Sequence, residues 1–249
     1  MATFEGTIYS DALRMMTSIT VSIPQVVEGD MPVLYLLHGL SDNHSAWLRR
    51  SNVDLYAEKS GFAVVMPEVQ RSFYTDMAYG LRYFTYIADE LPKICCRLFR
   101  FSDKRENKFI AGLSMGGYGA MKAALTYPDR YLAAASFSGA LHIKKSCKNS
   151  SDLISYQECY GINHGRISED DDLFSLAEMM KTCGEYPDFY ITCGLADFLY
   201  EDNRDFCLQL EKLSVPYKYE EWEGAHNWEF WNESIRRAIL HFAKIRSEQ

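Results

Sequence analysis

The sequence lacks the features that mark membrane, exported or nucleic-acid-binding proteins. No run of apolar residues reaches the roughly 18 to 20 that span a bilayer. The first residues contain neither a basic start nor an apolar run, so no signal peptide is predicted. Lys and Arg number 26 against 34 Asp and Glu, and the net charge of -8 disfavours binding to a phosphate backbone. We therefore expect a cytoplasmic protein without a membrane or nucleic-acid partner.

The sequence has neither a cysteine framework nor a linker that would divide the chain. The seven cysteines are odd in number and lack the spacing of metal ligands, so we expect reduced thiols and neither a disulfide framework nor a metal site. No repeat and no Pro/Gly/Ser-rich linker divides the 249 residues. Because a chain of this length can bury a large core without a covalent staple, residues 1–249 are predicted to form a single domain.

Short apolar runs alternate with stretches of helical spacing along most of the chain. The expected strands are Ser18 to Ile23, Val33 to Leu37, Phe62 to Met66, Phe109 to Leu113, Leu132 to Phe137, Phe189 to Cys193 and Tyr217 to Trp222. The expected helices are Ala46 to Glu58, Tyr83 to Leu98 with a kink or a new start at Pro92, Met115 to Tyr127, Leu173 to Met180, Asn203 to Leu213 and Trp228 to Ile245. This alternation predicts an α/β fold with a mainly parallel sheet covered on both faces.

One region interrupts the alternation. Residues 141–182 contain no strand pattern and are rich in Ser, Lys, Asn and Asp. Because a long insertion in a compact domain is usually functional, we interpret it as a lid beside the site. The alternative is a surface excursion without a role.

A short glycine-rich motif carries the strongest chemical signal. Gly112-Leu113-Ser114-Met115-Gly116 matches G-x-S-x-G and falls between an expected strand and an expected helix, which is the context that the motif requires. A nucleophile on such a sharp turn has close neighbours, and the flanking glycines remove the Cβ atoms that would clash. Ser114 is therefore the candidate nucleophile.

A serine hydroxyl needs a base, and the base needs an acid. His226 lies in the loop between a late strand and the last helix, whereas His142 and His164 fall in the insertion and His241 falls inside a helix. His226 is the candidate base.

The candidate acid comes from a loop that lies between the nucleophile and the base in the chain. Asp197 follows the expected strand Phe189 to Cys193, which gives the order Ser, Asp, His. Asp202 and Asp205 are rivals, but Asp202 is expected to cap a helix beginning near Asn203, and Asp205 to lie in its first turn.

Backbone N–H groups are expected to bind the oxyanion. One belongs to the residue after the nucleophile, Met115, and the other to Leu40, in the loop after Val33 to Leu37. His38 is expected to organise this loop, with a second base and a substrate contact as the alternatives. Trp47, Tyr74, Trp228 and Trp231 are candidates either for the pocket wall or for the core.

Taken together, these residues resemble the esterase D and S-formylglutathione hydrolase group of the α/β-hydrolases, and especially small bacterial tributyrin or acetyl esterases. The motifs that carry the resemblance extend over nearly the whole chain: His38-Gly39-Leu40-Ser41, Ser72 to Met77, Gly112 to Gly119, Cys193 to Asn203 and His226-Asn227-Trp228. The chain differs from many relatives in having apolar Leu195 and Ala196 before Asp197, and the insertion matches nothing familiar.

The resemblance implies hydrolysis of short-chain acyl esters, including acetylated or feruloylated carbohydrate, by the triad Ser114, Asp197 and His226. It also implies a homo-oligomer without a cofactor. Three alternatives stay open: an S-formylglutathione hydrolase, acyl transfer to an alcohol, and a non-catalytic binding protein on the same scaffold.

Overall fold

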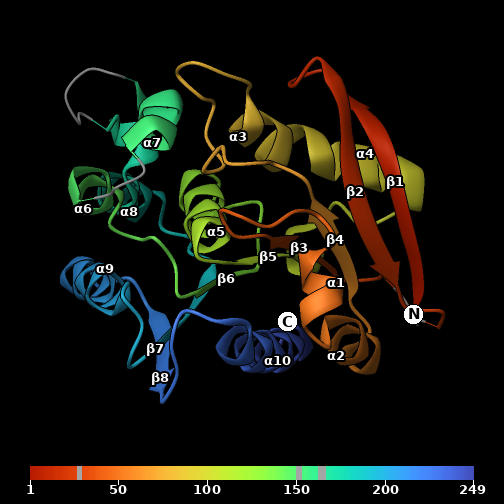
Figure 1. The fold of residues 1–249 in the computed structure, drawn as a ribbon. Helices are drawn as coiled ribbons and strands as arrows, with labels where there is room; N and C mark the ends of the chain where they lie inside the picture. The colour runs from red at the N-terminus through yellow and green to blue at the C-terminus, as the bar shows by residue number, and fades with distance from the viewer. Residues whose placement is uncertain (27–29, 150–152, 162–166) are drawn as a thin grey trace.

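The computed structural model describes residues 1–26, 30–149, 153–161 and 167–249, in which an eight-stranded sheet lies between two layers of helices (Figure 1). The strand order is β1-β2-β4-β3-β5-β6-β7-β8. β1 pairs antiparallel with β2, and β2 pairs antiparallel with β4. The other six strands, from β4 through β3 to β8, run parallel to one another. The strands are β1 (Ala2–Ser10), β2 (Met15–Ile23), β3 (Val33–Leu37), β4 (Ala63–Pro67), β5 (Lys108–Leu113), β6 (Ala133–Phe137), β7 (Asp188–Gly194) and β8 (Tyr217–Trp222). The prediction of a mainly parallel sheet is confirmed.

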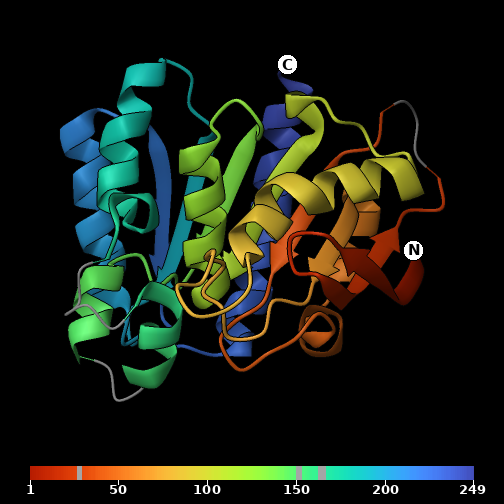
Figure 2. The ribbon, with the colours of Figure 1, turned by 90° about the horizontal axis from the view of Figure 1, so that it is seen from above.

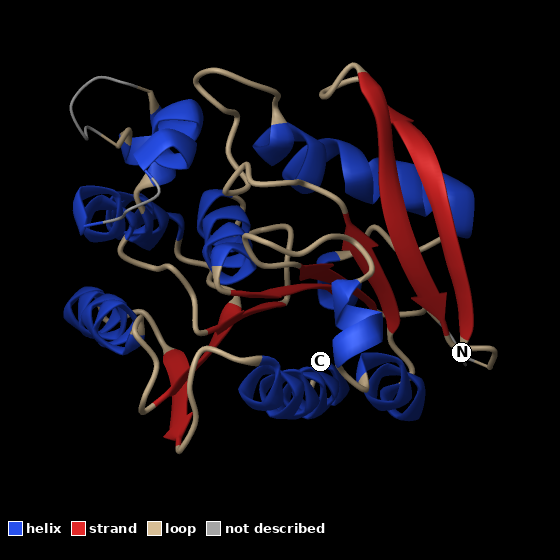
Figure 3. Cartoon of the chain, in the orientation of Figure 1, coloured by secondary structure: helices blue, strands red, loops and turns tan. Residues whose placement is uncertain are grey.

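Helices cover both faces of the sheet (Figures 2 and 3). One face carries α1 (Ala46–Arg50), α2 (Val53–Ser60) and α10 (Trp228–Ser247). The other carries α4 (Leu91–Phe99), α5 (Met115–Thr126), α8 (Leu173–Met180) and α9 (Tyr200–Leu213). Both faces are buried, because alternate residues of β3 enter different cores: Val33, Tyr35 and Leu37 on the α5 side, Leu34 and Leu36 on the α10 side.

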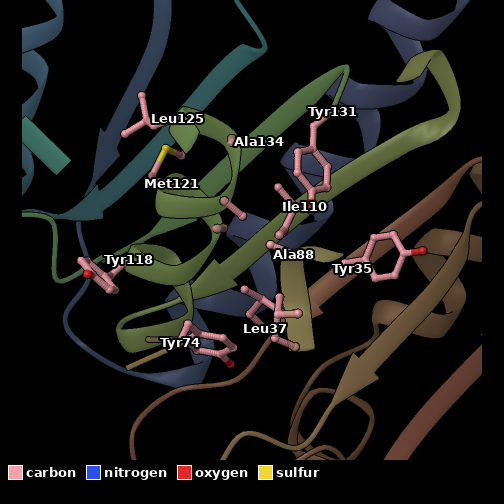
Figure 4. Close-up of a cluster of buried hydrophobic side chains, with 14 of the residues drawn as sticks. Tyr35, Leu37, Tyr74, Ala88, Ile110, Tyr118, Met121, Leu125, Tyr131 and Ala134 are labelled. Carbon is pink, nitrogen blue, oxygen red and sulfur yellow. The ribbon is translucent and has the colours of Figure 1, made fainter. Parts of the chain in front are cut away.

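The core on the α5 side is continuous from the helix to the central strands. Figure 4 shows part of it, with side chains of α5 gathered over those of the sheet: Tyr118, Met121, Leu125, Tyr35, Leu37, Ile110 and Ala134. This packing matters for function because α5 begins directly after Ser114, so a rigid helix on a rigid sheet fixes the position of the candidate nucleophile.

Several elements differ from the sequence-based expectation. β1 was not predicted, because this edge strand has no buried face to produce a regular alternation. The single helix expected over Ala46 to Glu58 is two helices, α1 and α2, separated at Ser51 and Asn52. Between α3 (Tyr83–Thr85) and α4 the chain forms a π-helical turn at Tyr86–Glu90, just before Pro92, which has no N–H to donate.

The insertion contains α6 (Ile143–Asn149), α7 (Leu153–Tyr160) and α8, and parts of it lie outside the described residues. Its described residues are joined to the main body by hydrogen bonds. The amides of Ala78 and Tyr79 donate to the carbonyls of Cys159 and Glu158, and the Tyr118 hydroxyl on α5 donates to the Asp171 carbonyl. Among the described helices, none combines the length and the apolar character that crossing a bilayer requires.

Candidate active site

Ser114 stands on a strained turn between β5 and α5. Its backbone has φ 52 and ψ -115, a conformation that a residue with a side chain rarely adopts. A Cβ on Gly112 would lie 2.4 Å from the Gly116 backbone, and a Cβ on Gly116 would lie 2.4 Å from the Leu37 carbonyl oxygen. The glycines of the motif therefore allow the turn to approach both α5 and β3, as the sequence predicts.

Ser114, His226 and Asp197 form one hydrogen-bonded chain. His226 Nε2 lies 3.0 Å from the Ser114 Oγ, and His226 Nδ1 lies 3.0 Å from each carboxylate oxygen of Asp197. A carboxylate only accepts hydrogen bonds, so Nδ1 carries the proton and Nε2 accepts from the serine hydroxyl. The three residues come from the ends of β5, β7 and β8, which meet at one edge of the parallel sheet.

The imidazole of His226 is held between two aromatic rings. Trp231 of α10 meets it edge-on, with ring centroids 4.9 Å apart, and Phe198 lies 4.4 Å away at a tilt of 46°. Together with the carboxylate behind it, these contacts restrict the ring to an orientation in which Nε2 faces Ser114.

The acid loop is connected to the nucleophile by a buried amide. Asp197 accepts a hydrogen bond from the Leu199 N–H at 2.9 Å. The Asn203 side-chain amide donates to the Leu199 carbonyl at 2.8 Å and to the Gly139 carbonyl at 2.9 Å. Next to Gly139, the Ala140 N–H donates to the Ser114 carbonyl at 3.1 Å. Asn203, which is fully buried, thus joins the loop of the candidate acid to the loop after β6, which in turn binds the Ser114 carbonyl.

The loop after β3 lies against the start of α5, because a Cβ on Gly116 would lie 2.7 Å from the His38 carbonyl oxygen. Leu40 lies in this loop, and among the described residues no acceptor takes the hydrogen of its amide. Met115 is the first residue of α5, where an amide N–H has no carbonyl one turn earlier to bind. These are the two N–H groups that the sequence analysis names as oxyanion candidates.

His38 organises this loop from inside the protein. Its Nε2 accepts a hydrogen bond from the Val69 N–H at 3.2 Å, and its Nδ1 donates to the Gly39 carbonyl at 2.8 Å. This pattern requires the neutral imidazole with the proton on Nδ1. Burial lowers the pKa of His38 below its ordinary value, which favours the same neutral form.

Three of the residues expected as pocket candidates support the loop from the core. Trp47 and Tyr74 are fully buried, and His38 is 1% exposed. The Trp47 indole donates to the Leu37 carbonyl at 3.0 Å, and the Tyr74 hydroxyl donates to the His38 carbonyl at 2.9 Å. The core alternative holds for them, since none presents a surface to a ligand. Trp228 is partly exposed and packs edge-on against Trp47, with ring centroids 5.1 Å apart.

The rival histidines and carboxylates lie in other surroundings. His241 contacts Asp188 at the opposite end of β7, and His164 is outside the described residues. Asp202 does not cap its helix as expected, because α9 already begins at Tyr200; it is buried and binds Lys145 of α6 at 2.9 Å. His142 lies near Asp202 and Asp205, a group with the donor atoms of a metal site. The Lys145 ammonium already binds both carboxylates.

Comparison with known proteins identifies the family. A family model described as a putative esterase matches residues 10–242 of the chain. The chain belongs to this esterase family. An acetyl esterase of Caldicellulosiruptor saccharolyticus is 31% identical to it over 264 residues, which cover 98% of this chain and 99% of that enzyme.

Solved structures of serine hydrolases share the architecture of this esterase. FphF, a fluorophosphonate-binding serine hydrolase of Staphylococcus aureus solved with substrate bound, has a TM-score of 0.90 and 32% identity, with 97% of this chain and 98% of that chain covered. An S-formylglutathione hydrolase of the same organism has a TM-score of 0.88 and 32% identity over the same shares of both chains. The fold is that of the α/β-hydrolases, and the esterase is a serine carboxylesterase.

Sequence reasoning missed two residues of the site, Phe198 and Asn203. Both belong to the motif Cys193 to Asn203 that carried the family resemblance. An asparagine at a helix start and a phenylalanine beside a loop are ordinary in a sequence, and only their contacts across the fold distinguish them.

Proposed function

We propose that the esterase hydrolyses short-chain acyl esters through an acyl-enzyme, with Ser114 as nucleophile, His226 as base and Asp197 as the residue that orients the base. The observation that carries the proposal is the hydrogen-bonded chain from Ser114 Oγ through His226 to Asp197, with 3.0 Å at each step. Ester hydrolysis by such a chain requires no cofactor.

In the first half-reaction, His226 Nε2 takes the Ser114 proton while Oγ attacks the ester carbonyl. The carbonyl oxygen becomes an oxyanion, to which the N–H groups of Leu40 and Met115 donate hydrogen bonds. Asp197, whose side chain is fully buried, stabilises the imidazolium that forms. The tetrahedral intermediate collapses, the ester C–O bond breaks, and His226 gives its proton to the leaving alcohol.

In the second half-reaction, water replaces the alcohol. His226 takes a proton from water as the water oxygen attacks the acyl carbon, and the proton then returns to Ser114 Oγ as the acid leaves. Only the neutral imidazole can accept a proton, so each half-reaction begins with His226 protonated at Nδ1 alone.

Hydrolysis of p-nitrophenyl acetate, butyrate and octanoate by the wild type and by Ser114→Ala tests this proposal. We expect hydrolysis of acetate or butyrate in preference to octanoate, and a loss of about 10⁶-fold in the variant. An undiminished rate in Ser114→Ala would overturn the assignment of the nucleophile. A wild type inactive on all three esters would favour a non-catalytic binding protein.

Hydrolysis of S-formylglutathione is the second candidate reaction. It is favoured by the Staphylococcus aureus neighbour of that description, which is 32% identical to this chain, as FphF is. A thioester carbonyl would use the same triad and oxyanion site, so the two reactions differ only in what binds the leaving group. The ratio of kcat/KM for S-formylglutathione to kcat/KM for ethyl acetate separates them.

We also propose that residues 141–182 act as a lid over the site. Support comes from Lys145 of α6, whose ammonium joins the insertion to Asp202 and Asp205 of α9, the helix that follows the acid loop. If the insertion forms part of the pocket, Lys145→Ala changes the ratio of butyrate to acetate hydrolysis. A ratio identical to that of the wild type would favour a surface excursion.

A further inference from the structure

Two large apolar side chains are exposed in the loop that carries the candidate acid. Phe198 is 76% exposed and Leu195 is 45% exposed, and both lie in the loop between β7 and α9 that contains Asp197. Large apolar side chains are normally removed from water, and when they gather on a surface they mark a binding site.

The position of Phe198 indicates which portion of the ester it contacts. Its ring lies 4.4 Å from the His226 imidazole, centroid to centroid. His226 gives its proton to the leaving alcohol, so the alcohol oxygen must come within hydrogen-bonding reach of Nε2. The acyl carbonyl oxygen is bound elsewhere, by the N–H groups of Leu40 and Met115. The group that reaches the exposed face of Phe198 is therefore the alcohol portion.

Charge restricts which alcohols suit this surface. The two segments that contain Phe198 and His226, residues 194–203 and 221–228, have acidic residues but no Lys or Arg, and the next residue, the exposed Arg204, lies over the Tyr219 ring. Glu201, Glu221 and Glu223 are exposed in these segments. Like charges repel, so an alcohol or thiol bearing carboxylates is disfavoured here relative to a neutral one.

We propose that Phe198 and Leu195 form an apolar platform that binds the alcohol portion of the ester, and that the preferred alcohol is neutral and carries a ring with a flat face. This inference rests on the proposed function. A ring stacks on Phe198 in an offset or tilted arrangement, a contact that a short alkyl alcohol is too small to make. The platform thus selects the alcohol portion of the ester.

The test compares acetate esters that differ only in the alcohol. The probes are benzyl acetate, ethyl acetate, the 6-O-acetyl ester of methyl glucopyranoside and 4-(acetoxymethyl)benzoate. Wild type is compared with Phe198→Ala and with Phe4→Ala, a matched control because Phe4 is 52% exposed on β1 at the opposite edge of the sheet. Thermal unfolding of each variant checks that the fold is retained.

We expect the kcat/KM ratio of benzyl acetate to ethyl acetate to fall about two- to tenfold in Phe198→Ala, as the loss of one aromatic contact predicts, and to stay unchanged in Phe4→Ala. We also expect the benzoate to be a poorer substrate than benzyl acetate. If Phe198→Ala lowers kcat/KM more for the glucopyranoside ester than for benzyl acetate, the ring that binds Phe198 best is a sugar ring rather than an aryl ring.

Two results would overturn the inference. An equal loss on benzyl and ethyl acetate would mean that Phe198 acts only by holding His226, and equal rates for the benzoate and benzyl acetate would refute the role of charge. Failure of the proposed function is distinguishable, because the wild type would then hydrolyse none of the four esters or Ser114→Ala would keep its activity.

Discussion

The hydroxyl of Tyr74 allows a direct test of how the loop that contains Leu40 is held. Tyr74→Phe removes a single oxygen atom and leaves the ring in place. That hydroxyl donates to the His38 carbonyl at 2.9 Å, and both residues are buried. Phe73 and Tyr74 also have positive φ, of 49 and 53, so this segment is strained and depends on its contacts. The hydrogen bond is thus a direct restraint on the loop that leads to Leu40.

The size of the effect follows from the burial of the carbonyl. A buried acceptor left without a partner costs about 1–3 kcal/mol. For a chain of this size each kcal/mol lowers Tm by about 2–4 °C, so we expect Tm to fall by about 2–12 °C. Removal of an oxyanion donor costs about 10²–10³ in kcat. A donor that is displaced rather than removed loses only part of this stabilisation of the oxyanion. We therefore expect kcat on p-nitrophenyl acetate to fall about tenfold, with a smaller change in KM.

Tyr190→Phe is the matched control. Tyr190 is also fully buried, and its hydroxyl donates to Glu220 at 2.7 Å on the α10 side of the sheet. Lys218 and Arg237 remain bound to Glu220 in the variant, so a modest change in Tm and no change in kcat are expected. If Tyr74→Phe lowers Tm but keeps the kcat of the control, the hydroxyl stabilises the protein without positioning the loop that contains Leu40, and the prediction is wrong.

Three further predictions concern the acid, its loop and acid stability. Asp197→Asn should lower kcat by about 10⁴ with little change in KM, because the amide no longer holds the reactive tautomer of the base; a loss below tenfold would contradict this. Asn203→Ala should lower kcat, whereas Asn107→Ala, which removes a buried amide bonded to Ser102 at the far end of β5, should lower only Tm. Hydrogen bonds from Arg236, opposed by burial, set the pKa of Glu233 at about 2, below its ordinary 4.5. Its contribution to stability is present above about pH 4.5 and lost as the pH falls toward about 2, so Glu233→Gln should flatten the acid limb of urea-unfolding stability measured between those values.

Much of the site was predictable because its requirements are local or ordered along the chain. The turn at Ser114 needs small neighbours on either side, and Gly112 and Gly116 are adjacent to it in the sequence. The candidate acid and base could be chosen because Asp197 and His226 follow buried strands, and the ends of parallel strands meet at one edge of the sheet. Apolar runs such as Val33 to Leu37 also predict buried strands without reference to their partners.

Tertiary structure decided the features that depend on which surfaces meet. The edge strand β1, the burial of His38, Trp47 and Tyr74, and the bridge made by Asn203 involve partners distant in the chain. The contact of Phe198 with His226 is of the same kind. A residue's type and its neighbours in the chain constrain the backbone that it can adopt. The sequence by itself therefore determined the turn at Ser114, the order Ser, Asp, His of the candidate triad after successive strands, and the alternation of helices and strands. Whether an aromatic side chain supports a loop or faces a substrate depends on contacts that exist only after folding, and only the structure decided it.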